Sequence, residues 1–87
     1  MIVRGIEIFD KIKEDYIGFI QLNVSFETLS KKYYNELRYD PELCYDYEIT
    51  INDEIFYKNI INYNFEFDKY SYYLTCYNSN EKTKLQL

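Results

Sequence analysis

The sequence contains no histidine and no tryptophan, and it has only two glycines and one proline among its 87 residues. Without histidine the chain lacks the commonest general base and a principal zinc ligand, which excludes a zinc site. Gly5 and Gly18 do not form a glycine-rich phosphate-binding loop. Neighbouring carboxylates, such as Glu66 and Asp68, lack a pocket that would separate their pKa values. We therefore expect no catalytic, cofactor or metal site, and a protein that is not an enzyme.

Long apolar runs are also missing, and the first residues do not show the basic-then-apolar layout of a secretory signal. These absences predict no membrane contact and a cytoplasmic location, in the host cell if the gene belongs to a phage. Only two cysteines are present, Cys44 and Cys76. They could meet across a sheet, and a disulfide or redox role is the alternative. Because cytosolic thiols are normally kept reduced, we expect both to be free, buried and dispensable for folding.

What the sequence does contain is apolar and aromatic surface. Apolar residues make up 47% of the chain and aromatic residues 21%, which is enough to bury a core in a chain of this size. Twelve residues are tyrosine. Since Tyr, Ile, Lys and Asn all have AT-rich codons, a low-GC genome would produce the same excess without selection for binding. We predict a single domain over residues 1–87.

The clearest local pattern is an apolar stripe at helical spacing, formed by Phe26, Leu29, Tyr33 and Leu37. Ser25 is placed to cap the first turn, and the Asp40-Pro41 pair prevents continuation. The pattern predicts a helix over 26–37.

After the proline the apolar period changes to two. Tyr45, Tyr47, Ile49 and Ile51 alternate with polar residues, which predicts a half-buried strand that ends in a turn at 52–53. Residues 61–67 repeat the alternation, and Asp68-Lys69 predicts a hairpin turn to a strand over 70–77. A last short strand is expected at 82–87.

The first 24 residues allow two interpretations. Ile6, Phe9, Ile12 and Tyr16 fit a helix, whereas Ile2, Ile6 and Ile8 also suit a strand. We favour a short helix over about 6–15, followed by a strand over 17–24. Together these elements predict an α+β fold in which one or two helices pack on one face of a four- to five-stranded, mainly antiparallel sheet.

Charge is distributed unevenly along the chain. The net charge is −5, yet residues 39–68 alone carry −7, with Lys58 as their single base. Strand alternation should gather these acids on one face, which would repel nucleic acid and attract a basic protein surface. The candidate partner-binding residues are Asp40, Glu42, Asp46, Glu48, Asp53, Glu54, Glu66 and Asp68. The competing interpretation is an ordinary solvated face that keeps the domain soluble.

A small, acidic, Tyr-rich and His-free chain resembles, in composition, phage-encoded inhibitors of the anti-CRISPR and anti-restriction type. It also resembles immunity proteins that neutralise nuclease toxins. No segment matches a motif of these families, so no functional residue is carried over. The resemblance implies an inhibitor that blocks the basic groove of a nucleic-acid-processing enzyme by mimicking phosphate charge. Toxin immunity and a structural or self-association module, including a homodimer, are the alternatives.

Overall fold

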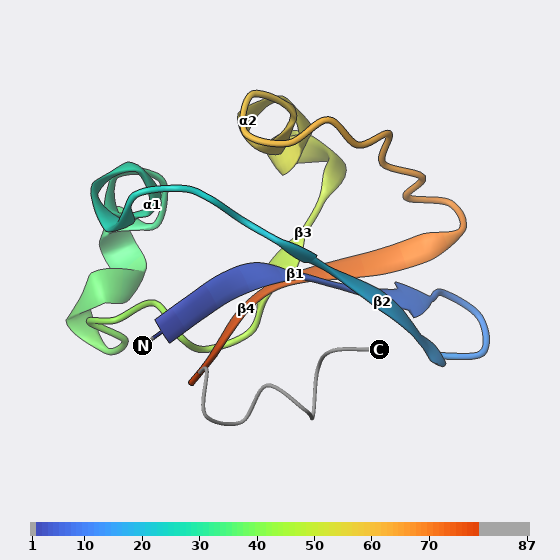
Figure 1. Cartoon of the computed structure of the whole chain (residues 1–87), viewed down its shortest axis with the longest axis horizontal. Coiled ribbons are helices and arrows are strands. Elements are labelled where there is room, and N and C mark those ends of the chain that lie inside the picture. The colour runs from blue at the N-terminus through green and yellow to red at the C-terminus, as the bar shows by residue number, and fades with distance from the viewer. Residues whose placement is uncertain (1, 79–87) are drawn as a thin grey trace.

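The protein folds around one antiparallel sheet with helices on one side. The structure, a computed structural model, describes residues 2–78. Its strands are β1 (Ile2–Asp10), β2 (Tyr16–Gln21), β3 (Tyr47–Ile49) and β4 (Tyr70–Asn78). Its helices are α1 (Phe26–Lys32), α2 (Glu54–Lys58) and the 3-10 turns η1 (Tyr34–Arg38) and η2 (Ile51–Asp53). Within the described residues the sheet has four strands in the order β2-β1-β4-β3 (Figure 1), which confirms the predicted α+β class.

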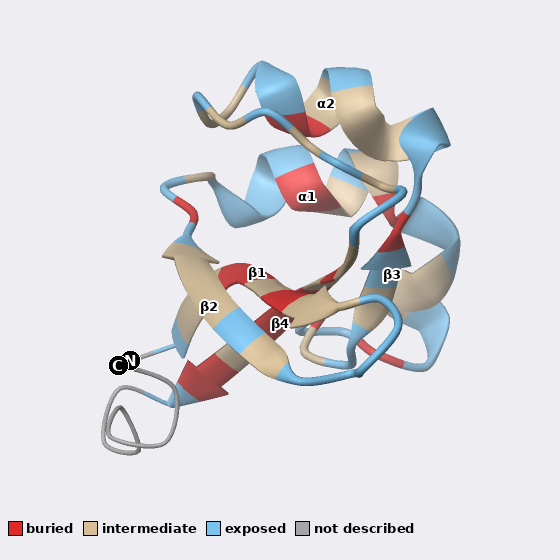
Figure 2. Cartoon of the chain, turned by 90° about the vertical axis from the view of Figure 1, so that its right-hand side faces the viewer, coloured by how far each residue is buried: buried red, intermediate tan, exposed pale blue. Residues whose placement is uncertain are grey.

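The two faces of the sheet differ in what covers them. Figure 2 shows α1 and α2 on the same side of the sheet. On that side the alternate residues of β1 and β4 pack against the helices, because residues opposite each other in antiparallel strands point to the same face. The core consists of Ile6, Ile8, Leu22, Leu29, Tyr33, Leu43, Ile49, Tyr57, Tyr72 and Leu74. The other side has no helix of the described chain upon it.

The helix expected over 6–15 is wrong. These residues form most of β1 and a turn, in which Ile12 is 90% exposed. Ile6 and Ile8 are buried on the same face of β1 and pair with Leu74 and Tyr72 of β4. A period of two therefore outweighed the helical spacing, because β1 is a central strand with neighbours on both sides. The strand predicted at 17–24 is confirmed as β2, displaced toward the N-terminus.

The helix predicted over 26–37 is present but interrupted. Ser25 caps α1, its hydroxyl oxygen accepting the backbone N–H of Thr28 at 3.1 Å. The α-helix ends at Lys32, and Tyr33 leaves helical geometry with φ −107° and ψ 39°. The chain then tightens into η1. Leu29 and Tyr33 of the predicted stripe are buried, whereas Phe26 is exposed.

The strand predicted around 45–51 is shorter than expected. Only Tyr47–Ile49 forms β3, while Tyr45 is 58% exposed and Ile51 is 69% exposed. The predicted turn at 52–53 instead begins a helix. Thr50 and Asp53 form a capping box, in which Asp53 accepts the backbone N–H of Thr50 at 2.8 Å. This cap turns the chain into η2 and α2.

Residues 61–67 alternate as predicted without becoming a strand. Tyr63, Phe65 and Phe67 are half-buried between exposed neighbours, and all three rings contact Tyr72. A ladder with β4 is prevented because β1 and β3 already occupy its two sides. The turn at 68–69 is confirmed, with the Lys69 and Tyr70 N–H groups both donating to the Glu66 carbonyl. The strand expected at 82–87 lies outside the described residues.

The expectation of free cysteines is also wrong. Cys44 and Cys76 form a disulfide that joins the segment before β3 to β4. Their Cα atoms are 5.1 Å apart, within the usual range for a disulfide. The two cysteines meet across the sheet because β3 lies beside β4, and the expected cytoplasmic location had argued against this bond.

Candidate functional site

The eight acids singled out from the sequence do not form one surface. Asp40 is only 4% exposed, so its placement on a partner-binding face is corrected. Its carboxylate accepts the backbone N–H of Cys44 at 3.1 Å, that of Tyr45 at 2.9 Å, and the Tyr47 hydroxyl. Burial alone would raise the pKa of Asp40, but these hydrogen bonds and the charge of Arg4 lower it. Asp40 therefore holds the loop before β3 in place.

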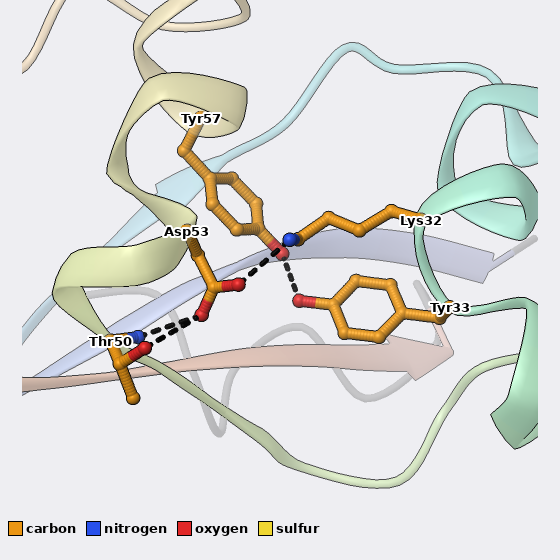
Figure 3. Close-up of polar contacts among 5 residues, drawn as sticks. All are labelled: Lys32, Tyr33, Thr50, Asp53 and Tyr57. Atoms are coloured by element: carbon orange, nitrogen blue, oxygen red, sulfur yellow. Dashed lines mark hydrogen bonds and ion pairs between the residues drawn. The ribbon is translucent and has the colours of Figure 1, made fainter.

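Three more of these acids are engaged in ion pairs. Asp53 accepts from Lys32 Nζ at 2.7 Å and also caps η2, as Figure 3 shows. A carboxylate oxygen of Glu54 lies 3.9 Å from Lys58 Nζ, and one of Glu66 lies 3.3 Å from Lys69 Nζ. In these two pairs the partners are four and three residues apart in the sequence. Such exposed local pairs contribute little to stability. Their negative charge is partly neutralised, which makes them weaker candidates for steering a partner.

The hydroxyls of Tyr33 and Tyr57 lie 2.7 Å apart in a buried position. Figure 3 shows this contact beside Lys32. Burial raises the pKa of Tyr33 to about 12, and burial also raises the pKa of Tyr57. Both tyrosines therefore stay protonated in the folded protein at pH values where they ionise in the unfolded chain. Since the unfolded chain then binds fewer protons, stability should fall as the pH rises above about 10.

We expect the free energy of unfolding to drop by on the order of 1–2 kcal/mol per buried hydroxyl between pH 10 and 12. Urea unfolding at several alkaline pH values measures this loss. A Tyr33→Phe, Tyr57→Phe variant should lose the share of this dependence that these two hydroxyls supply and keep the share of Tyr47 and Tyr63, whose pKa values burial also raises. Tyr34→Phe, at a side chain 73% exposed, should behave as wild type. Equal alkaline slopes in all three proteins would contradict the assignment.

Four acids of the predicted set are exposed and take part in none of the ion pairs just described: Glu42, Asp46, Glu48 and Asp68. Two of them, Asp46 and Glu48, lie at the side of the sheet that no described helix covers (Figure 2). Glu48 pairs across strands with Tyr73, which pairs in turn with Glu7. The charge of Asp46 acts on Glu7, so these two carboxylates are also close. Glu7 was not predicted, because the residues around it were assigned to a helix.

The side of the sheet that no described helix covers (Figure 2) combines these acids with aromatic rings. We call it the open face and define it by Glu7, Phe9, Phe19, Glu48, Tyr73 and Tyr77, which the strand registers place on the side opposite the core. Tyr77 is itself buried, whereas Glu7, Phe9, Phe19 and Tyr73 are half-buried and Glu48 is exposed. One row crosses all four strands in the order Phe19, Glu7, Tyr73, Glu48. Recognising β1 as a strand would have revealed this face, since its alternate residues include Glu7 and Phe9.

The rings of the open face contact one another edge to face. Phe9 lies 5.8 Å from Tyr73, and Phe19 lies 5.6 Å from Tyr77, between ring centroids. Phe19 reaches Tyr77 across β1 because Gly5 lies between them. A Cβ atom at Gly5 would stand 2.2 Å from the Phe19 ring, closer than any real contact. The glycine thus permits an aromatic layer on a face that carries no helix.

The open face is electrostatically one-sided. Burial, and then the charge of Asp46, raise the pKa of the half-buried Glu7. In the registers of the described strands, no Lys or Arg stands on this side. Glu7 and Glu48 therefore have no Lys or Arg beside them on the described strands, and a positively charged group brought from outside would meet favourable potential there.

Two further kinds of site were sought within residues 2–78. No group of three or more His, Cys, Asp or Glu side chains there could hold a metal ion. No helix in that range is long and apolar enough to cross a membrane.

The fold and this face define a small α+β domain with one helix-covered and one open, acidic and aromatic sheet face. The chain belongs to the family described as domain of unknown function DUF7683, whose model matches residues 3–75. The match includes β1, β2, β3 and most of β4, and therefore nearly all of the open face. No curated protein matches the chain, and no solved structure does.

Proposed function

We propose that this chain is a non-enzymatic binding protein whose open face docks on a basic protein surface. The observation that carries the proposal is the cluster of Glu7, Asp46 and Glu48 among aromatic rings, on a sheet face where the described strands place no Lys or Arg. Aromatic side chains supply contact area at small entropic cost, and carboxylates steer a positively charged partner into register. A polyanion such as DNA would be repelled by the same face.

In its most specific form, the proposed partner is a nucleic-acid-processing enzyme that the chain inhibits. Alternate residues of an extended chain repeat about every 6.7 Å, and Glu48 lies in β3 with Asp46 just before it. Glu7 lies two strand spacings, about 9.6 Å, from Glu48. Such an array supports mimicry of phosphates in a basic groove. Toxin immunity remains the nearest alternative, since a nuclease toxin presents a groove of the same charge.

The proposal places this action in the cytoplasm. A disulfide is typical of oxidising compartments, so the redox form that meets the target depends on where the chain acts. The partner assay described next is therefore run with and without reductant.

Charge reversal tests the proposal. Asp46→Lys with Glu48→Lys places like charges against a basic partner, and we expect partner affinity to fall on the order of a hundredfold, most strongly at low salt. Folding should change little, roughly within 0.5 kcal/mol per exposed charge. The matched control is Asp15→Lys with Glu27→Lys, which makes the same change of charge at exposed positions in the β1–β2 turn and at α1.

The measurement begins with capture from host extract on the immobilised wild type and both double variants. The captured protein is then purified and titrated against each, with a competing oligonucleotide. The proposed inhibition is supported if only the Asp46→Lys, Glu48→Lys variant loses affinity for the partner and the wild type displaces the oligonucleotide from it. Equal affinity of all three proteins would refute the role of the open face. Retardation of bare oligonucleotides by the chain alone would also refute it.

A further inference from the structure

The two edge strands of the described sheet, β2 and β3, differ in how well they are protected against pairing with a strand of another molecule. β3 has only three residues, with Glu48 at its centre and Asp46 just before it, and short charged edges resist strand addition. β2 has six residues, Tyr-Ile-Gly-Phe-Ile-Gln, without charge or proline, and β1 is its only strand neighbour in the described chain. We propose that β2 is a self-association edge, to which β2 of a second copy of this chain adds in antiparallel orientation.

The backbone hydrogen bonds show which groups of β2 are available. The Leu22 N–H donates to the Arg4 carbonyl at 2.8 Å, and the register pairs Ile6 with Ile20 and Ile8 with Gly18. Hydrogen-bonded and non-hydrogen-bonded pairs alternate along an antiparallel ladder. The N–H and C=O groups of Gly18, Ile20 and Leu22 therefore point toward β1. Those of Phe19 and Gln21 point away from β1, along the edge that no other described strand covers.

The β-bulge in β2 fixes the register of this pairing. Ile8 pairs with Gly18 but Phe9 pairs with Tyr16, so Ile17 is the extra residue. Bulges disturb the edge on which they lie, which confines regular pairing to 18–22. A twofold axis between the Ile20 residues of the two copies pairs residues 18–22 of one copy with residues 22–18 of the other. It places Phe19 opposite Gln21 of the second copy, so that their outward groups exchange hydrogen bonds.

Electrostatics favours the edge over the open face as the contact between identical copies. Stacking two open faces would bring Glu7, Asp46 and Glu48 against like charges. Across a β2–β2 seam the nearest acids of the open face, the two Glu7 side chains, are separated by three strand spacings, about 14 Å. This distance exceeds the Debye length of about 8 Å at physiological salt. The net charge of −5 per chain therefore opposes edge pairing only weakly.

A proline at Gln21 tests the proposal, because its missing N–H lies on the free edge and takes no part in the β1 ladder. The matched control, Gln21→Thr, keeps the N–H and suits a strand. By sedimentation velocity over a concentration series, wild type and Gln21→Thr should reach a dimer. Gln21→Pro should remain a monomer, or dimerise at least tenfold more weakly. Thermal melts confirm that each variant is folded. If Gln21→Pro fails to fold, Gln21→Lys replaces it, since an edge lysine also resists pairing.

Amide hydrogen exchange tests the register of the proposed β2–β2 pairing. In wild type, the Phe19 and Gln21 amides should exchange more slowly as the concentration rises, whereas the Ile20 and Leu22 amides should be protected at all concentrations. A monomeric wild type, or a dimer that leaves Phe19 and Gln21 exchanging freely, would overturn the proposal. Neither result would affect the proposed function, because the open face and the β2 edge are tested by different variants.

Discussion

Replacing Cys44 and Cys76 together by serine is expected to lower the free energy of unfolding by roughly 3–4 kcal/mol. The bond closes a loop with a sequence separation of 32, and the chain-entropy model gives about 3.7 kcal/mol for such a loop. For a domain of this size, the melting temperature should fall by on the order of 20 °C. Circular dichroism melts without reductant measure the effect.

The reduced wild-type protein is the control for this prediction. Reductant should lower the wild-type melting temperature to about that of the double serine variant, and it should leave the variant unchanged. If the variant melts within a few degrees of the oxidised wild type, the cysteines are dispensable, as the sequence had suggested.

Asp40→Ala should destabilise the protein by about 3 kcal/mol, because it leaves three part-buried donors, the N–H groups of Cys44 and Tyr45 and the hydroxyl of Tyr47, without their acceptor. Loss on this scale would free the loop that carries the disulfide and leads into β3. Asp40→Asn keeps one acceptor oxygen and should cost less. Asp68→Ala, at an exposed carboxylate, is the matched control and should stay within 0.5 kcal/mol.

The pH dependence provides a second readout for Asp40. Its pKa is lowered in the folded protein, so its contribution is present above the unfolded value near 3.9 and is lost as the pH falls toward the folded value. Denaturant titrations between pH 6 and pH 2 give the free energy of unfolding of the wild type and of Asp40→Ala. The difference between the two at each pH is the contribution of the Asp40 carboxylate. A wild type and an Asp40→Ala variant with parallel acid profiles would contradict the role given to the carboxylate.

The fold class was predictable where local signals agreed with the tertiary structure. Ser25 capped a helix and Leu29 and Tyr33 faced the core, because capping and helical periodicity act within a few residues. At 6–12 the signals conflicted, since the same isoleucines fit both periods. Pairing with β4, which decides in favour of a strand, is invisible locally. Residues 61–67 show the reverse case, in which the alternation was read correctly but no strand edge was available.

The candidate site was predicted in part. Asp46 and Glu48 were identified and are exposed, but Asp40 and Asp53 look identical to them in a charge count. What separates these acids is whether backbone amides or Lys32 reach them, and that depends on the path of the chain between α1 and β3. Glu7 and the rings of the open face were missed because they come from β1, β2 and β4, and become neighbours only when the sheet is assembled.

The central position of β1 also has a consequence for how the chain acquires its structure. Of the described strands β1 is synthesised first, yet it pairs along its whole length with β4, with Ile6 opposite Leu74. Contacts of such long sequence separation slow folding, because the intervening chain must be ordered before they form. The β1–β2 hairpin can appear early. The core should form only after β4 has been synthesised, so nascent chains that stop before Tyr70 should remain unfolded and sensitive to protease.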